Sequence, residues 1–375
     1  MDFDFTEDQA SLRDAVRRWV DKGFSFERRH QLAKAGGHTR AVVSELAELG
    51  LTALVIAEEH GGMGQGPIDA MIVSEELGRG LVNAPYAFAS LMAPRMLAAA
   101  PAELQASWLP RIADGSALVV PALQERAARY DLDHVQTQAR AAGAGWLLEG
   151  SKVVVPAGDE ADAFIVSARV SGPARGSEGI GLFLVERDAV QVRGYPTQDG
   201  ARAADLLFQA SAAQLIAEEA FALIEDAVDA GIAAQCAEAV GLMDRLVAIT
   251  VDYMNTRKQF GVTLASFQAL RHRIADVKMQ LELGRSMSYY ASLKLSEPAQ
   301  NRRRAVAQAR VQLGHSMRFV GQQCIQLHGG IGCTDEYIAS HYFKRLTMLE
   351  MSLGDTLHHL GEVSSRMKDT AGVFA

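Results

Sequence analysis

The sequence predicts a helical protein with a small β domain inserted between two helical parts. The first stretch, to about residue 115, repeats helical spacing; the next is made of short β-branched runs divided by turn residues; the last is helical with few breakers. A chain of 375 residues is also longer than one typical domain. We therefore expect an N-terminal helical domain over 1–115, a small antiparallel β domain over 116–213 and a C-terminal four-helix bundle over 214–375.

The N-terminal part opens with a helix-start signal. Thr6 and Gln9 have the spacing of a capping box, in which each side chain satisfies the other residue's backbone N–H. The apolar residues that follow fall on one helical face: Leu12, Val16, Trp19 and Val20. Further helical spacing is found over 42–49, 68–78 and 87–99, and glycine- or proline-containing connections separate these stretches.

The middle part changes to short runs that are rich in β-branched residues. Turn-forming residues divide the runs, which is typical of an antiparallel sheet rather than of alternating strands and helices. The expected strands lie within 117–122, 146–148, 152–155, 163–170 and 181–185.

The C-terminal part predicts long helices over 214–255, 266–295 and 297–327. Helices of this length that are apolar on more than one face usually form a bundle. We expect the apolar surface that remains to be buried between subunits.

Composition excludes several classes of function. Lys and Arg total 37 against 45 Asp and Glu, a net charge of −8, and no basic block offsets it, so nucleic acid is not an expected partner. Three scattered cysteines fit neither a disulfide framework nor a zinc site, and we expect no metal. The acidic N-terminus lacks the pattern of a secretory signal, and no long uncharged apolar stretch predicts a membrane span. A soluble, cytoplasmic protein is expected.

Several short motifs carry a resemblance to a known family. They are FTEDQ at the first helix, AEEHGG over 57–62, SEELGRG over 74–80, TRKQFG over 256–261 with FQA over 267–269, and QLHGGIG over 326–332. The last domain holds the most specific ones, R-x-x-F-G and Q-x-x-G-G-x-G. With these motifs the chain resembles, over nearly its whole length, the acyl-CoA dehydrogenases, flavoproteins that desaturate acyl-CoA thioesters between the α and β carbons.

The resemblance implies an FAD site that two subunits share across a dimer interface. Glycines allow a pyrophosphate to approach the backbone, arginine supplies a cation, and glutamine can hydrogen-bond without adding charge. The residues that would bind the cofactor are Arg257, Phe260, Gln268, Gln326, Gly329 and Gly330. The alternative is that the glycines only end a helix and that Arg257 pairs with a neighbouring acid.

The flavin-ring motifs of the family are altered in this chain. Relatives carry T-E-P-x-A-G-S-D, whereas residues 119–131 lack the Gly-Ser turn and are more charged. Relatives then carry G-x-K-x-W-I-T-N-G, in which the Trp and Thr touch the flavin. Here Val154 replaces the aromatic residue, and Pro156 replaces the hydroxyl and also removes a backbone N–H.

The catalytic base of the family is also missing. The chemistry needs a carboxylate that removes the α-proton while the flavin takes the β-hydride. Its commoner location is a Y-E-G-T loop, where the Glu falls on Leu353 or Gly354; the other lies near Gly231 and Ile232. Asp355 is the only carboxylate in the loop and is the candidate catalytic residue, although a helix N-cap is the usual role of such an aspartate.

Three hypotheses follow. The chain is a base-lacking small subunit that pairs with a homologous large subunit in a heterotetramer, most like that of a pimeloyl-CoA dehydrogenase-type enzyme; or an active homotetramer that uses Asp355; or a non-enzymatic scaffold with the same fold. The first two imply FAD as cofactor, an acyl-CoA as substrate and an electron-transfer flavoprotein as acceptor.

Overall fold

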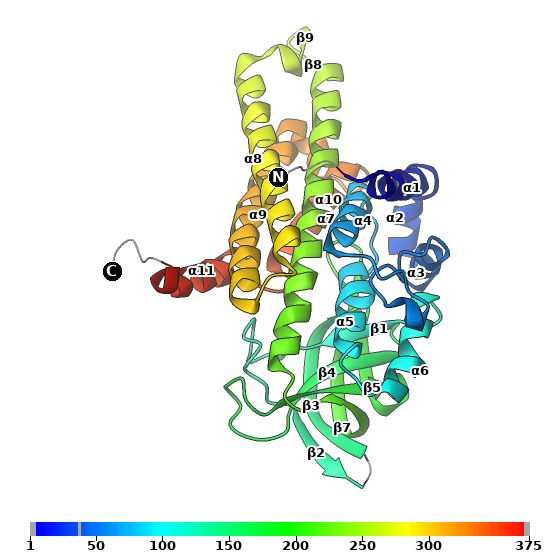
Figure 1. The fold of residues 1–375 in the computed structure, drawn as a ribbon. Coiled ribbons are helices and arrows are strands. Elements are labelled where there is room, and N and C mark those ends of the chain that lie inside the picture. The colour runs from blue at the N-terminus through cyan, green and yellow to red at the C-terminus, as the bar shows by residue number, and fades with distance from the viewer. Residues whose placement is uncertain (1–4, 37–38, 144, 371–375) are drawn as a thin grey trace. The chain divides into compact units, whose positions relative to one another are not determined.

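The computed structural model describes residues 5–36, 39–143 and 145–370 (Figure 1). The chain forms two compact units. The bundle unit comprises Met1–His30, Pro67–Val82 and Ile232–Ala375, and the sheet unit comprises Gln31–Gly66 and Asn83–Gly231. Both the N-terminal and the C-terminal thirds of the chain therefore contribute helices to the bundle unit.

Long helices make up the bundle unit, and α8 packs along α9 for most of its length. The helix α7 begins among residues of the sheet unit and continues into the bundle unit as one uninterrupted helix. The elements are α1 (Glu7–Gly23), α2 (Phe26–Lys34, which continues into the sheet unit), α4 (Pro67–Arg79), α7 (Phe221–Thr256), β8 (Lys258–Gln259), β9 (Val262–Thr263), η4 (Leu264–Ser266), α8 (Gln268–Lys294), α9 (Ala299–His328), η5 (Gly329–Cys333), α10 (Ile338–Met351) and α11 (Thr356–Thr370).

The predicted capping box at the first helix is confirmed. The Thr6 hydroxyl accepts a hydrogen bond from the Gln9 N–H at 3.2 Å, and the Gln9 side chain accepts one from the Thr6 N–H, also at 3.2 Å. This reciprocal pair satisfies two backbone donors that the first turn of a helix leaves without partners.

The helices α4 and α7 cross with their backbones in contact. A Cβ atom added at Gly78 of α4 would lie 2.1 Å from the carbonyl oxygen of Glu238 on α7. Reciprocally, a Cβ at Gly241 of α7 would lie 1.8 Å from the carbonyl oxygen of Glu75 on α4. No side chain fits in such a space, so the two glycines set how closely these helices approach.

The sheet unit contains most of the β structure and several short helices. The helical elements are α3 (Thr39–Glu48), η1 (Glu58–His60), the π-helical η2 (Ala87–Met92), α5 (Ala93–Leu97), α6 (Ala102–Ala113) and η3 (Arg187–Ala189). The strands are β1 (Val119–Ala122), β2 (Gln138–Ala142), β3 (Gly145–Pro156), β4 (Ala163–Arg169), β5 (Ile180–Glu186), β6 (Gln191–Pro196) and β7 (Arg202–Ala217).

These seven strands form one sheet in the order β1-β4-β2-β3-β7-β5, with β6 on β7. Because β5 also pairs with β4, the strands from β4 to β5 form a closed ring of pairings. The predicted sheet is mostly antiparallel, but β1 and β2 each pair with β4 in parallel. The expected antiparallel pairing holds for most of the sheet, and the two parallel pairings were not expected: a parallel pair requires a crossover connection, which short-range alternation in the sequence does not reveal.

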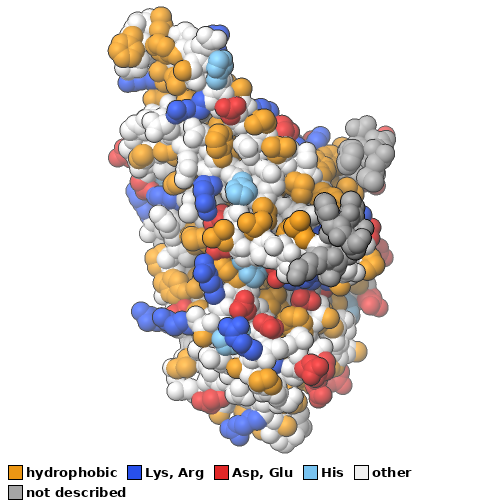
Figure 2. Space-filling view, turned by 90° about the vertical axis from the view of Figure 1, so that its left-hand side faces the viewer, with side chains coloured by type: hydrophobic (Ala, Val, Ile, Leu, Met, Phe, Trp, Pro, Cys, Tyr) orange, Lys and Arg blue, Asp and Glu red, His pale blue; other side chains and the backbone are white. Residues whose placement is uncertain are grey.

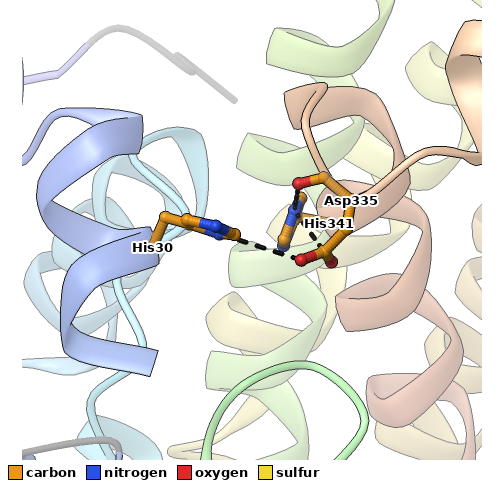
Figure 3. A group of neighbouring side chains, drawn as sticks. All are labelled: His30, Asp335 and His341. Atoms are coloured by element: carbon orange, nitrogen blue, oxygen red, sulfur yellow. Dashed lines mark hydrogen bonds and ion pairs between the residues drawn. The ribbon is translucent and has the colours of Figure 1, made fainter. Parts of the chain in front are cut away.

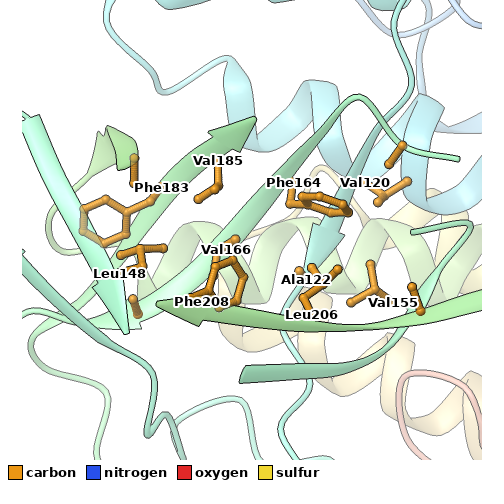
Figure 4. Close-up of a cluster of buried hydrophobic side chains, with 14 of the residues drawn as sticks. Val120, Ala122, Leu148, Val155, Phe164, Val166, Phe183, Val185, Leu206 and Phe208 are labelled. Atoms are coloured by element: carbon orange, nitrogen blue, oxygen red, sulfur yellow. The ribbon is translucent and has the colours of Figure 1, made fainter. Parts of the chain in front are cut away.

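Alternating side chains from these strands fill the interior of the sheet unit (Figure 4). Phe164 and Val166 of β4 meet Phe183 and Val185 of β5 and Phe208 of β7, and each is fully or almost fully buried. Such a cluster removes apolar surface from water and fixes the register of the strands, because a shift by one residue would expose it.

One predicted boundary is wrong. The helix expected from Gln214 begins at Phe221, because the residues up to Ala217 complete β7 and pair with β5. Only four residues, Gln214 to Ala217, lie between the expected start and the end of β7, and so short a run does not separate strand alternation from helical spacing. The fold class itself, helical parts around a β domain with a C-terminal bundle, is confirmed. Among the described residues, no helix combines the length and hydrophobicity needed to cross a bilayer.

Candidate active site

A two-residue hairpin turn at the end of α7 carries the most exposed aromatic side chain of the described residues. The turn between β8 and β9 consists of Phe260 and Gly261, with φ of +54° and +83°. Positive φ at both positions is what a type I′ hairpin turn requires, and it is unfavourable for phenylalanine. Phe260 is 92% exposed, and Figure 2 shows hydrophobic side chains gathered at this tip of the bundle unit. An aromatic side chain that is exposed on an unfavourable backbone conformation indicates that Phe260 has a role in binding.

Arg257 lies directly before this hairpin. Its backbone N–H donates to the carbonyl of Tyr253 at 2.8 Å, whereas its exposed guanidinium has no ion-pair partner among the residues that the structure describes. The pairing with a neighbouring acid, which the sequence left open, is therefore not seen within that part of the chain. Gln268 is the first residue of α8 and is likewise exposed. Both polar side chains are accessible to a ligand.

The Gly-Gly loop follows the end of α9. Gly329 is the C-cap of that helix with φ +65°, and a Cβ at Gly329 or Gly330 would meet nothing within 4 Å. Gln326 is exposed on the last helical turn. The loop thus is a helix C-cap, as the alternative interpretation held, and it also leaves open space above its backbone, which a pyrophosphate needs.

A ring cluster places the Gly-Gly loop beside the end of α7. The buried ring of His328 lies 4.7 Å from that of Tyr253 and 5.2 Å from that of Tyr337. Its Nδ1 donates to the carbonyl of Cys324 at 2.8 Å, and burial lowers the pKa of His328. Because Tyr253 is one turn before Arg257, the two motifs that the sequence singled out meet in one region of the bundle unit.

Asp355 caps the last helix. Its Oδ1 accepts a hydrogen bond from the His358 N–H at 2.8 Å, and α11 begins at the next residue, Thr356. This is the geometry of an N-cap, in which the carboxylate satisfies a donor of the first turn. The catalytic role of Asp355 stays a prediction.

The loop before Asp355 is tightly held by a buried arginine. Arg310 of α9 donates to the carbonyl of Ser352 at 2.6 Å, to that of Gly354 at 3.4 Å and also to that of Leu349. Sequence reasoning missed this residue, although a signal was present: Arg310 interrupts an apolar helical stripe formed by Val306, Leu313 and Met317. A charged residue on a buried face is expected to have a specific partner.

The structure also connects the loop with α7, which carries the second location of a catalytic base in the family. Gln235 lies one turn after Gly231, and its Nε2 donates to the Ser352 hydroxyl at 2.9 Å. The side chain of Gln235 is buried. The loop is thus hydrogen-bonded to α7 through Gln235, and Asp355 is the only carboxylate among the loop residues 352–355.

In the sheet unit, the altered flavin-ring motif lies on a β-bulge. The register of β3 against β7 shifts between Lys152 and Val155. Val154 has φ +54°, is 44% exposed, and donates its N–H to a carboxylate oxygen of Asp205 at 3.2 Å. Bulges are frequent beside active sites because they redirect one side chain.

A group of two histidines and an aspartate resembles a metal site but is engaged otherwise (Figure 3). Arg29 can only donate, so its 2.9 Å contact makes Nδ1 of His341 an acceptor; Nε2 then carries the proton and donates to the backbone carbonyl of Asp335 at 2.9 Å. Lys344 lies 3.0 Å from the Asp335 carboxylate, and His30 lies 4.0 Å from it. Both ring nitrogens of His341 are therefore engaged in hydrogen bonds, and the cations Arg29 and Lys344 lie beside the group. We interpret the group as a hydrogen-bonded cluster rather than as a metal site.

We predict that His359 makes the stability of the bundle unit fall in mild acid. Burial first, and then the positive charge of Arg310, lowers the pKa of this histidine from 6.5 to about 3. Its Nε2 donates to the carbonyl of Leu353 at 3.1 Å. Below pH 6.5 the unfolded chain therefore binds a proton at His359 that the folded chain does not bind. The free energy of unfolding is at its full value above pH 6.5 and decreases as the pH falls; at about pH 5 the decrease is about 2 kcal/mol.

The measurement is the free energy of urea unfolding between about pH 5 and 8 for the native chain and for His359→Gln. Glutamine keeps an N–H donor and does not titrate, so its profile should be flatter. Equal slopes for the two proteins would contradict the assignment.

Comparison with known proteins identifies the family. The chain matches family models of the acyl-CoA dehydrogenase N-terminal domain over residues 6–116, middle domain over 121–210 and C-terminal domain over 221–368. The acryloyl-CoA reductase (NADH) of Anaerotignum propionicum is 25% identical over 378 residues, which cover 96% of this chain and 94% of that protein.

Solved structures agree with the family models. A variant of the Tcur3481–Tcur3483 steroid ACAD is 26% identical, with a TM-score of 0.86 over 97% of this chain and 99% of that one. The ChsE4–ChsE5 complex of Mycobacterium tuberculosis is 24% identical, with a TM-score of 0.89 over 99% and 100%, which shows the same fold. The chain belongs to the acyl-CoA dehydrogenase family.

Proposed function

We propose that this chain is the base-lacking subunit of a heteromeric, FAD-dependent acyl-CoA dehydrogenase. The observation that carries the proposal is a contrast within the bundle unit. The residues for the dinucleotide end are present and exposed, whereas the loop that presents the base in relatives is ordered and tightly packed but offers no carboxylate other than the helix cap Asp355. A division of function, in which this subunit helps to bind FAD and a related subunit carries the base, explains both the retained binding residues and the missing carboxylate.

The residues at the end of the bundle unit fit the adenine and pyrophosphate end of FAD. An anion suits the exposed guanidinium of Arg257, and the backbone of Gly329 and Gly330 is open where a Cβ would stand. Gln268 and Gln326 would donate to ribose, phosphate or adenine edges. Bound FAD would act as the acceptor of the hydride from the β carbon of the substrate, and the residues of this chain would bind and orient the FAD.

The exposed apolar residues favour a partner chain over this region. Besides Phe260, the residues Val262, Met279 and Leu283 are between 44% and 54% exposed on the hairpin and on α8. Phe260 and Val262 lie on the hairpin beside Arg257, Met279 and Leu283 lie further along α8, and exposed apolar side chains of this kind are typical of a protein interface. A homologous large subunit that carries the glutamate is the partner we propose, in a heterotetramer; the double name of the Tcur3481–Tcur3483 steroid ACAD is consistent with such pairing in that relative.

The chemical class of the substrate follows from the family, and the acyl group stays a proposal. An acyl-CoA thioester is the proposed substrate and an electron-transfer flavoprotein the proposed acceptor; the pimeloyl-CoA type of small subunit is one version of this proposal. Because one relative bears the name acryloyl-CoA reductase (NADH), the assay should follow both directions of the reaction.

The second candidate is an active homotetramer with Asp355 as the base. It rests on Asp355 being the one carboxylate of the loop, and the hydrogen bond of its Oδ1 to the His358 N–H speaks against it. If Asp355 were the base, Asp355→Asn would abolish dehydrogenation and leave flavin content unchanged. A scaffold without flavin is the third possibility, and an absence of flavin from every preparation would favour it.

We predict that Arg257→Ala releases FAD. The guanidinium is the cation that the proposal places at the pyrophosphate, and loss of one charge-assisted contact typically costs about 1.5–3 kcal/mol, or roughly ten- to a hundredfold in affinity. The measurement is the visible flavin spectrum of the chain purified alone and co-expressed with a homologous large subunit. Arg273→Ala, a change at a half-exposed arginine on α8 outside the motifs, is the matched control.

The outcomes separate the hypotheses. Flavin only with the large subunit, and lost in Arg257→Ala, supports the heteromer. Flavin in the chain alone, bleached by an acyl-CoA, would favour the homotetramer. Unchanged flavin occupancy in Arg257→Ala would refute the assignment of that residue.

A further inference from the structure

One imidazole ring connects the segment that follows the Gly-Gly loop with the helix α2. His341, in the first turn of α10, is 6% exposed, and its Nε2 donates to the backbone carbonyl of Asp335 at 2.9 Å. Its Nδ1 accepts from a guanidinium nitrogen of Arg29 on α2, also at 2.9 Å. Only the neutral ring can make both hydrogen bonds, because one nitrogen must donate while the other accepts.

The connected segment continues directly from the Gly-Gly loop. Asp335 comes two residues after the end of η5, and two residues further on the ring of Tyr337 lies 5.2 Å from that of His328. His328 is the residue directly before Gly329. The two hydrogen bonds of His341 therefore hold one end of a short segment whose other end is the Gly-Gly loop.

The charges around His341 determine what a proton would do there (Figure 3). Arg29 is 2% exposed, and Lys344 lies three residues along α10; both are cations. The Asp335 carboxylate lies 3.4 Å from Nε2 of His341 and 4.0 Å from the ring of His30 on α2. A proton on Nδ1 would place an N–H donor against the Arg29 guanidinium, and burial keeps water from separating the two cations, so this hydrogen bond must break.

We propose that His341 is a positioning residue for the Gly-Gly loop, and that protonation of its ring in mild acid releases the adjoining segment from α2 and weakens binding of the dinucleotide. The link to α2 stands on the two hydrogen bonds and does not depend on the identity of the ligand. The effect on dinucleotide binding rests on the proposed function.

The direction of the effect follows from the pKa of His341 in the two forms. In the closed form burial, and then the charges of Arg29 and Lys344, lower this pKa, although the hydrogen bond to Asp335 opposes them. In the released form the ring meets water and its pKa returns to about 6.5. Below that pH the released form binds a proton that the closed form does not bind, so the equilibrium constant for release increases as the pH falls.

The expected size of the effect is up to about tenfold in that equilibrium constant between about pH 7.5 and 5.5. Protonation of His30 acts in the opposite sense, because a charged His30 is attracted to the Asp335 carboxylate. His359 titrates over the same range, but it is present in every variant compared below, so differences between variants isolate His341.

The first measurement is amide hydrogen–deuterium exchange of the full-length chain at about pH 7.5 and 5.5, with each rate divided by the intrinsic rate at that pH. In the native chain, the protection of α2 and of residues 334–337 should fall in acid. In His341→Gln the side-chain oxygen can accept from Arg29 and the amide can donate to Asp335, and the protection should stay, because glutamine does not titrate. His315→Gln, at an exposed residue of α9, is the matched control and should follow the native profile.

Two further variants test the cause. A glutamine amide can present its N–H to the neutral ring or its oxygen to the protonated ring, so Arg29→Gln should keep α2 attached in acid and lose the pH dependence. This variant also serves if His341→Gln does not fold. His30→Gln should lose at least as much protection in acid as the native chain, because it lacks the opposing attraction to Asp335.

The second measurement is the dissociation constant of FAD at the same two pH values. It uses the complex with a homologous large subunit, from which bound flavin has been removed, and flavin fluorescence as the signal. The native complex should bind FAD up to about tenfold more weakly at the lower pH, whereas the His341→Gln complex should show little change. His328 is common to both complexes, so its own titration does not enter the difference.

Each outcome decides a defined part of the proposal. Equal pH dependence of α2 protection in the native chain and in His341→Gln overturns the inference, and so does a pH dependence that only His30→Gln removes. Release of α2 in acid with an unchanged FAD dissociation constant overturns the positioning role of His341. If no preparation binds FAD, the proposed function fails, and the exchange profiles still decide whether His341 is the proton-sensitive link to α2.

Discussion

Gly241→Ala is expected to destabilise the bundle unit by about 3 kcal/mol or more. The added Cβ would stand 1.8 Å from the carbonyl oxygen of Glu75 and 2.7 Å from the backbone nitrogen of Arg79. Both are backbone atoms of α4, so no side-chain rotation relieves the overlap, and α4 must move away from α7. The measurement is the free energy of urea unfolding, followed by circular dichroism.

The matched control is Gly361→Ala on α11. A Cβ at Gly361 meets nothing within 4 Å, and the residue is exposed within a helix. Alanine should stabilise that helix by up to about 1 kcal/mol, because it loses less backbone freedom on folding than glycine. If the two substitutions had similar effects, the contact between the two helix backbones would not be the determinant of packing described above.

Glu125→Gln is expected to cost the sheet unit about 3–5 kcal/mol. Lys152 is fully buried, and its Nζ lies 2.8 Å from Oε1 of Glu125, 3.0 Å from the Ser167 hydroxyl and 3.2 Å from the carbonyl of Leu123. Burial lowers the pKa of Lys152, and Glu125 opposes that effect. Glutamine has nearly the shape of glutamate but leaves the ammonium group without its counter-charge.

The pH dependence and a double variant check the cause. Without Glu125 the pKa of Lys152 falls further, so the unfolded chain holds a proton that the folded chain releases, and Glu125→Gln should regain stability as the pH rises above neutrality. Glu125→Gln combined with Lys152→Met removes both charges and should recover more than half of the loss. Additive losses in the double variant would contradict a charge-pair explanation.

Much of the fold was predictable because its local signals are strong. The capping box at Thr6 and the long helices of the bundle depend on residues three or four apart, which a sequence displays directly. The parallel pairing of β1 with β4 was not predictable in this way, since it joins Val119 to Ala163 through a crossover. The start of α7 differs from the expected one because the last residues of β7, from Gln214 to Ala217, form too short a run to show the period of a strand.

In the candidate site, too, the local motifs were predictable from the sequence and the long-range contacts were not. Arg257 and the Gly-Gly loop were predicted as motifs, and the structure adds that the ring of His328 packs on that of Tyr253. The contact between Arg29 and His341 could not be predicted from sequence, since the two residues lie 312 positions apart. Arg310 is visible in the sequence only as a charge within an apolar helical stripe, and its partners are not, because backbone carbonyls leave no trace in the residue types of the loop.

The discontinuous make-up of the bundle unit constrains the order in which a nascent chain can fold. All residues of the sheet unit precede Ile232, so that unit can complete its core while the last third of the protein is still being translated. In contrast, Met71 and Ile72 of α4 pack on Ala237 of α7, which the ribosome makes much later. These apolar side chains must wait without their partners, which makes the interval between α4 and α7 the period in which a chaperone would be of most use.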